Sequence, residues 1–157
     1  MLRLDERAVQ ARVEHMIARM NSDFTDSVFG MLAPQLHACE PSRQELTLIF
    51  PGRHWERNGR GAIHGGIVSA MFDTAMGTLT CAVSGALTPT INLSVSYPRP
   101  VPLDGTFLVR VWITKLGRSV ISVSGELCDA RAPKTVLCTA SGTFRSFEQE
   151  KQREDFT

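Results

Sequence analysis

Apolar residues recur along this chain with two different periods, and the change of period separates helical from extended regions. Over residues 5–20 the apolar positions follow helical spacing, with charges of both signs between them, which predicts a surface helix packed by one stripe. Residues 66–84 are apolar on every side of a helix, which predicts a long helix that the rest of the fold covers nearly all round. Gly85 comes next and is typical of a residue that ends a helix.

Six segments carry the alternating pattern of half-buried strands. They are residues 31–39, 45–50, 90–97, 107–114, 120–129 and 135–147. The first two are joined by a turn at Pro41, and a short helical turn is expected before Gly30. The last four are polar on one side, so we expect them to form an antiparallel meander. Together these elements predict an α+β fold, in which a curved antiparallel sheet of about six strands wraps around a long central helix.

Composition narrows the class of protein. At 157 residues, we expect a single domain over residues 1–157, with a charged tail at about residues 148–157. The net charge of +1 indicates neither nucleic acid nor an anionic membrane as a partner. The first 20 residues are too charged for a signal peptide or a membrane span. The four cysteines form no CxxC pair and are expected to be reduced and mostly buried, so we predict a cytoplasmic location.

One acid, Asp73, interrupts the long apolar helix, where an ionised carboxylate without partners is strongly unfavourable. One interpretation is a structural acid that a hydroxyl or a backbone amide satisfies, or that lies at an edge. The other is a catalytic acid. His64, Gly65 and Gly66 begin the same helix, and unpaired N–H groups at a helix start attract negative charge. Two glycines let a ligand approach that backbone, where an oxyanion would be stabilised.

The spacing of these residues constrains any shared role. Asp73 lies nine residues beyond His64, which is roughly 13 Å along a helix. One carbonyl carbon cannot easily contact both within a single chain. A two-fold dimer with antiparallel central helices would bring Asp73 of one subunit close to the Gly65 amide of the other, so we expect a site that two subunits share.

Several residues in one order form a wider motif, Asn-x5-His-Gly-Gly-x6-Asp followed by Thr-x6-Tyr. Its members, with further matches, are Asn58, His64, Gly65, Gly66, Asp73, Ala75, Gly77, Thr90, Leu93, Tyr97, Pro100, Gly117 and Arg118. With these residues the chain resembles the hotdog-fold thioesterases, and within them the phenylacetyl-CoA (PaaI-type) branch, over about residues 58–144. The resemblance implies an acyl-CoA thioesterase that hydrolyses an acyl- or aryl-acyl-CoA to the free acid and coenzyme A. It also implies a homodimer or a homotetramer.

The resemblance further implies a role for each of five residues. The Gly65 N–H polarises the thioester carbonyl, and Asp73 of the other subunit is either the nucleophile or the general base. Asn58 orients the water or the thioester, and His64 supports the loop and Asn58 by hydrogen bonding. The Thr90 hydroxyl contacts the attacking water or the acid.

Substrate contacts are expected in two places. Gly66, Phe72 and Met76 would lie near the acyl group. Basic and small residues at strand connections would bind the phosphates of coenzyme A. They are Arg99, Lys115, Gly117, Arg118 and Ser119. The histidines have no metal-ligand spacing, so we expect no metal site, and no cofactor beyond the coenzyme A of the substrate.

Two other functions stay open. A hotdog-fold enoyl-CoA hydratase or dehydratase would use a paired histidine and acid, for which His64 and Asp73 are candidates. A non-catalytic acyl-CoA-binding domain would have no need of Asp73. The sequence does not distinguish coenzyme A from acyl carrier protein as the carrier, and it does not specify the acyl group.

Overall fold

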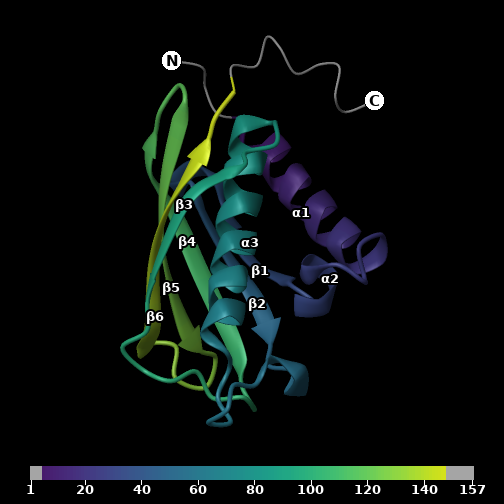
Figure 1. Ribbon diagram of the computed structural model, residues 1–157. Coiled ribbons are helices and arrows are strands. Elements are labelled where there is room, and N and C mark those ends of the chain that lie inside the picture. Colours follow the sequence, from purple (N-terminus) through teal and green to yellow (C-terminus); the bar gives the residue numbers. More distant parts are fainter. Residues whose placement is uncertain (1–4, 148–157) are drawn as a thin grey trace.

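A six-stranded antiparallel sheet curves around one long helix in the computed structural model, which describes residues 5–147 (Figure 1). The helices are α1 (Glu6–Ser22), α2 (Val28–Leu32) and α3 (Gly65–Ser84), with short 3-10 turns η1 (Pro41–Arg43) and η2 (His54–Glu56). The strands are β1 (Gln35–Glu40), β2 (Glu45–Pro51), β3 (Thr90–Ser96), β4 (Thr106–Leu116), β5 (Val120–Asp129) and β6 (Val136–Arg145). The predicted α+β architecture is confirmed, whereas the tail predicted at 148–157 lies outside the described residues.

The order of the strands differs from a simple meander. In space the order is β1-β2-β4-β5-β6-β3, so the strands that neighbour each other in both chain and sheet are β1 with β2, and β4, β5 and β6 in turn. The four-strand meander expected after the helix is therefore wrong for β3, which pairs with β6 at the far edge. The place beside β4 is taken by β2, with Leu48 opposite Val109. As a result β1 and β3 are the two edges of the sheet.

The first strand begins later than its pattern predicts. Residues 31 and 32 belong to α2, and Ala33 ends that helix in the left-handed conformation with φ of 48°. Pro34 follows, and the strand starts at Gln35. The alternation of residues 31–39 thus runs across a helix end, a turn and a strand, and periodicity alone cannot separate them.

The helix α3 is the centre of the core, as predicted. It is long and apolar enough to cross a membrane by length and composition, but 61% of that stretch is buried inside the fold. Phe72, Met76 and Leu79 are fully buried. On the facing strands, Gly125 and Gly142 leave room for Met76, because an added Cβ there would lie 3.2 Å and 3.1 Å from its side-chain atoms.

One stripe of α3 is not covered by the sheet. Its residues, all small or polar and all at least partly exposed, are Gly66, Ser69, Ala70, Asp73, Gly77 and Cys81. The stripe follows helical spacing, so these residues lie along one side of the helix. The helix α3 thus presents its acid on its uncovered side.

The helix α1 lies across α3 and contributes the stripe that the sequence predicts, with Val9, Val13, Ile17 and Met20 buried. A hydrogen bond also links the two helices, because Arg12 Nη1 donates to the carbonyl oxygen of Ala82 at 2.9 Å. That carbonyl lies in the last turn of α3, where acceptors lack partners within the helix. Gly85 ends α3 as predicted, with φ of 73°.

Candidate active site

The first turn of α3 leaves one backbone donor free. His64 is the N-cap residue, and its Nδ1 accepts the Gly66 N–H at 2.9 Å. The His64 carbonyl accepts the Ile67 N–H at 2.9 Å. Within residues 5–147, the Gly65 N–H has no acceptor. The Gly65 N–H, which the resemblance implies polarises a thioester carbonyl, is therefore available to bind one.

The cap also indicates the tautomer of His64. Nδ1 accepts the Gly66 N–H, so in this arrangement the ring proton lies on Nε2. His64 bonds to Gly66 and, in the part of the chain that the structure describes, makes no hydrogen bond to Asn58, so the bond to Asn58 that the resemblance implies is not present. An added Cβ on Gly66 would lie 3.1 Å from His64 Nδ1, so glycine keeps this cap unobstructed.

Asn58 ties together the loop that leads to α3. Its Oδ1 accepts the N–H groups of Arg60 at 2.8 Å and Ala62 at 3.1 Å, and its own N–H donates to the Ala62 carbonyl at 2.7 Å. The Nδ2 group donates to no atom of the described residues. Asn58 is thus a loop-forming residue that retains a side-chain donor, the group needed to orient a water or a carbonyl.

Glu56 is a buried acid that the sequence does not reveal. It is only 1% exposed, and its carbonyl accepts the His64 N–H at 2.7 Å. Oε2 accepts the Arg53 N–H at 2.9 Å, whereas Oε1 has no partner among the described residues. Burial raises the pKa of Glu56, and the hydrogen bond and positive charge of Arg53 offset part of that effect. The backbone of Glu56 thus holds the start of α3, while its buried carboxylate holds the turn at Arg53.

Asp73 is held by a hydroxyl from the edge strand. Thr90 Oγ1 donates to Asp73 Oδ1 at 2.7 Å, so the pairing that the resemblance implies is present. A bulge between Thr90 and Asn92 makes this contact possible by changing the phase of β3. Ile91 lies at this bulge and is 54% exposed, so the regular alternation predicted for residues 90–97 is interrupted there.

Tyr97 is a further residue at the start of α3. Its hydroxyl donates to the Gly65 carbonyl at 2.9 Å and lies 2.6 Å from Ser69 Oγ. The resemblance includes Tyr97 but implies no role for it. The sequence signal was the place of a hydroxyl-bearing aromatic residue at the end of a predicted strand in the motif, and only the fold shows what Tyr97 contacts.

Two residues expected near the acyl group lie elsewhere. Phe72 and Met76 are both 0% exposed and belong to the hydrophobic core. They lie on the side of α3 that faces the sheet, and Asp73 lies on the uncovered side. The prediction that they line a substrate pocket is therefore corrected, since a helix that is apolar all round does not reveal which side the sheet covers.

The basic connection between β4 and β5 forms a surface depression of about 470 Å³. Its lining residues are Lys115, Gly117, Arg118, Ser119, Val120 and Ser122. Arg99 does not join this cluster. The Arg99 N–H donates to the Leu137 carbonyl, so Arg99 lies beside the start of β6. The β4–β5 connection lies beside Phe144, which is seven residues further along β6 and therefore roughly 23 Å from Leu137. Figure 1 shows the connection at the upper end of the sheet and the segment after β3 at the lower end.

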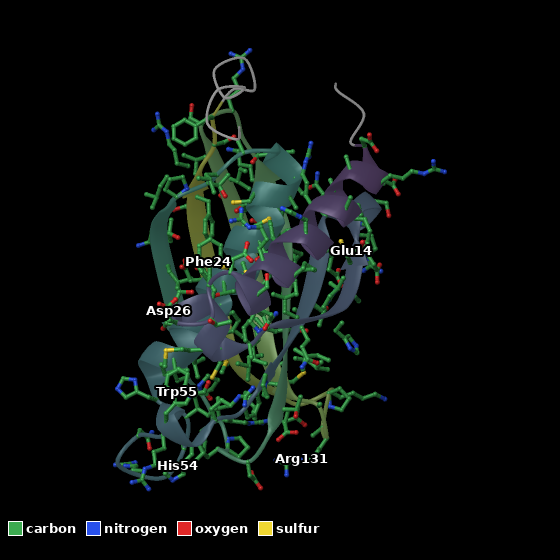
Figure 2. All side chains as sticks on the ribbon, turned by 90° about the vertical axis from the view of Figure 1, so that its right-hand side faces the viewer. Glu14, Phe24, Asp26, His54, Trp55 and Arg131 are labelled. Carbon is green, nitrogen blue, oxygen red and sulfur yellow. The ribbon has the colours of Figure 1, made fainter. Side chains whose placement is uncertain are left out.

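The loop before α3 lies at the end of the molecule where that helix begins. Figure 2 shows His54 and Trp55 of η2 there, below Phe24 and Asp26, which follow α1. Trp55 is 45% exposed.

No three side chains of His, Cys, Asp or Glu gather into a possible metal site within residues 5–147. The groups that the site offers for chemistry are the Gly65 N–H, the side-chain amide of Asn58 and the Asp73 carboxylate that accepts from Thr90.

The comparisons with known proteins agree with this arrangement. A family model described as the thioesterase superfamily matches residues 60–135. A candidate esterase of Halobacterium salinarum is 37% identical over 120 residues, which cover 70% of this chain and 72% of that protein. The acyl-coenzyme A thioesterase THEM4 of Bos taurus is 30% identical over 105 residues, which cover 66% of this chain and 41% of that protein.

One solved structure extends the comparison to three dimensions. A candidate thioesterase from Ralstonia eutropha, related to phenylacetic acid degradation, has a TM-score of 0.70 at 25% identity and covers 82% of this chain and 98% of that chain. The chain belongs to the thioesterase superfamily, and its fold is the hotdog fold. It spans less than half the length of the THEM4 relatives that it matches.

Proposed function

We propose that this protein hydrolyses an acyl- or aryl-acyl-CoA thioester to the free acid and coenzyme A. The observation that carries the proposal is the pair of groups on the uncovered side of α3, a free Gly65 N–H at its start and Asp73 fixed by Thr90 further along. A thioester needs these two groups, a donor for its carbonyl oxygen and a carboxylate for the attack. Membership of the thioesterase superfamily supports the same reaction.

We further propose that two chains form each site. Gly65 and Asp73 are eight residues apart, or about 12 Å along the helix, too far for one carbonyl carbon to reach both. The edge strand β3 has a neighbour on only one side, and Ile91 and Leu87 nearby are 54% and 64% exposed. Two such edges and two uncovered α3 stripes meeting about a two-fold axis would bury these groups and pair each Gly65 with the partner's Asp73. A tetramer would be two such dimers.

The reaction then follows from the groups present. The thioester carbonyl oxygen accepts the Gly65 N–H, and negative charge grows on that oxygen as the carbonyl carbon is attacked. Asp73 either removes a proton from the attacking water or attacks the carbon itself and is released by water. The C–S bond breaks with its electron pair on sulfur, and the coenzyme A thiolate takes up a proton of the water that the hydrolysis consumes. The amide of Asn58 is available to orient the water or the carbonyl.

The β4–β5 connection is our candidate for the phosphates of coenzyme A. Thr90, Phe144, Ile121 and Leu116 form one row across β3, β6, β5 and β4, so the connection lies three strands, or roughly 14 Å, from the Asp73 contact. Arg118→Gln should raise KM for a CoA thioester and leave KM unchanged for a short thioester without the nucleotide. Arg99→Gln is the matched control, and an equal rise in KM for both variants would contradict the assignment.

Thiol release from a panel of acyl-CoA thioesters, followed with a thiol-reactive dye, tests the reaction. Asp73→Ala should lower kcat by on the order of 10² or more, the size expected when a catalytic acid or base is lost, without loss of the fold. Undiminished turnover in that variant would rule out the mechanism. Ligand-protected melting without turnover on any thioester would instead identify a binding domain. The capped Nδ1 of His64 disfavours a hydratase that uses His64 as its base.

We also propose a cytoplasmic location and no cofactor. The four cysteines are free, and two of them are buried, which is the state expected in a reducing compartment. Hydrolysis needs water and the groups named above, so the coenzyme A of the substrate is the one nucleotide we assign to the site.

A further inference from the structure

Tyr97 contacts the start of α3 through its hydroxyl in a defined direction. The Gly65 carbonyl can only accept, so the single phenolic proton goes to Gly65, at 2.9 Å. The 2.6 Å contact with Ser69 Oγ must then have Ser69 as its donor. The result is a short chain of hydrogen bonds, from Ser69 to Tyr97 to Gly65, that ties the residue after β3 to the first turn of α3.

The peptide group between Gly65 and Gly66 is held from both sides. Tyr97 binds its oxygen, and His64 Nδ1 binds its N–H at 2.9 Å. The Tyr97 ring also packs on this backbone, because an added Cβ on Gly65 would lie 3.5 Å from two ring carbons. Two consecutive glycines are the most flexible backbone that a chain can have, so without these bonds the turn would sample many conformations.

That flexibility would affect catalysis directly. A backbone donor stabilises an oxyanion only if it already points at the place where the charge develops. The free donor at this turn is the N–H of Gly65, the residue whose carbonyl Tyr97 binds. Tyr97 is also 47% exposed, so its hydroxyl contributes a specific contact and the residue is not a member of the core.

We propose that Tyr97, supported by Ser69, is a positioning residue that holds the Gly65 N–H in the geometry required by the transition state. This rests on the proposed thioesterase function, in which Gly65 binds the carbonyl oxygen. Tyr97 acts through Gly65 and does not itself contact the reacting atoms. Its loss should therefore reduce the rate of the chemical step more than the binding of substrate.

Tyr97→Phe removes both hydrogen bonds and keeps the ring. We expect kcat to fall about tenfold, the upper end of the effect of one hydrogen bond between neutral groups, with KM changed less than about twofold. Ser69→Ala keeps the Tyr97–Gly65 bond and should lower kcat by less. Ser96→Ala, at an exposed position next to Tyr97 in the chain, is the matched control and should leave both constants unchanged.

A second measurement needs no activity. In Tyr97→Phe the Gly66 amide, whose partner His64 is untouched, should exchange its hydrogen with solvent faster than in the wild-type protein. If Tyr97→Phe changes neither kcat nor the exchange rate of the Gly66 amide, the inference is overturned. It is also overturned if KM rises as much as kcat falls while the exchange rate is unchanged, because Tyr97 would then contact the substrate. If the wild-type protein hydrolyses no thioester, the proposed function fails, while the exchange measurement still decides whether Tyr97 holds the turn.

Discussion

Thr90 donates its hydroxyl proton to Oδ1 of Asp73 over 2.7 Å, which joins the edge strand β3 to the middle of α3. The contact depends on the bulge between Thr90 and Asn92, which turns Thr90 toward the helix and leaves Ile91 exposed. A half-buried carboxylate that accepts such a bond is held in one orientation. The strand that would meet a second subunit therefore also directs the acid that would act in the shared site.

Replacing the Thr90 hydroxyl should weaken catalysis without unfolding the protein. Thr90→Val keeps the shape of the side chain and removes the donor, so we expect kcat to fall by on the order of 10-fold, which corresponds to one hydrogen bond to a charged group. Thr90→Ser keeps the donor and should retain most of the activity. Steady-state thiol release measures both variants, and equal rates for Val and Ser would show that the bond has no part in the reaction.

The Gly65 N–H can be removed by a single substitution. Gly65 is the first residue of α3, a position where proline is tolerated, and His64 already has the extended conformation, with ψ of 135°, that precedes proline. Gly65→Pro should therefore keep the helix and lower kcat by on the order of 10² or more, as for loss of one oxyanion donor.

Gly65→Ala is the control for this change, because it retains the N–H and its Cβ would make an ordinary 3.5 Å contact with Tyr97. We expect it to keep most of the activity. Circular dichroism and melting would verify that both variants fold. A folded Gly65→Pro protein with full turnover would exclude the Gly65 N–H as the oxyanion donor.

Glu56 should make stability depend on pH. Burial raises its pKa above the ordinary value of 4.5, so the folded protein binds this proton more tightly than the unfolded chain. The contribution is fully present below about pH 4.5 and is lost as the pH rises through the raised pKa. Glu56→Gln removes this titration, so its free energy of unfolding relative to the wild type should increase as the pH rises from 4.5 to neutrality.

Urea unfolding of both proteins across this pH range measures the difference. Asp26→Asn, at an exposed position, serves as the control and should show no such trend. A constant difference between Glu56→Gln and the wild type at every pH would mean that Glu56 does not titrate with folding.

Arg12 should stabilise the end of α3. Its guanidinium binds the Ala82 carbonyl at 2.9 Å, where the helix dipole favours a positive charge. We expect Arg12→Ala to lower the free energy of unfolding by about 1–2 kcal/mol. Arg7→Ala, on the same helix but without a hydrogen bond or ion pair to α3 among the described residues, should change the free energy of unfolding little. Equal losses in denaturant unfolding would assign the effect to helix α1 itself.

Long uninterrupted patterns were the part of the fold that the sequence predicted best. The predicted limits of α3 agree with the structure to within a residue, and the predicted limits of β5 (Val120–Asp129) agree completely. Each of these segments has one regular spacing of apolar residues and clear signals where it ends. Strand pairing was not predictable in the same way. The partner of β3 depends on how the chain returns around α3, and the bulge at Thr90 changes which residues face inward.

The residues of the candidate site likewise differ in how far the sequence could predict them. His64, Gly65 and Asp73 could be selected because a charge in an apolar helix and glycines at its start are visible in the sequence, whereas Thr90 was selected only through the family resemblance. Glu56 and the contact of Tyr97 with Gly65 could not, since both depend on loop and strand positions that only packing creates. For the same reason, Phe72 and Met76 were assigned to a pocket although the sheet covers them.

The shared site is tested most directly by combining two inactive chains. In a heterodimer of Asp73→Ala with Gly65→Pro, one site contains an intact Asp73 and an intact Gly65 from different subunits, and the other site contains neither. Purified with two different affinity tags, this heterodimer should regain about half of the wild-type kcat per dimer, although each parent homodimer is inactive. A purified heterodimer as inactive as its parents would show that Gly65 and Asp73 do not act together across subunits.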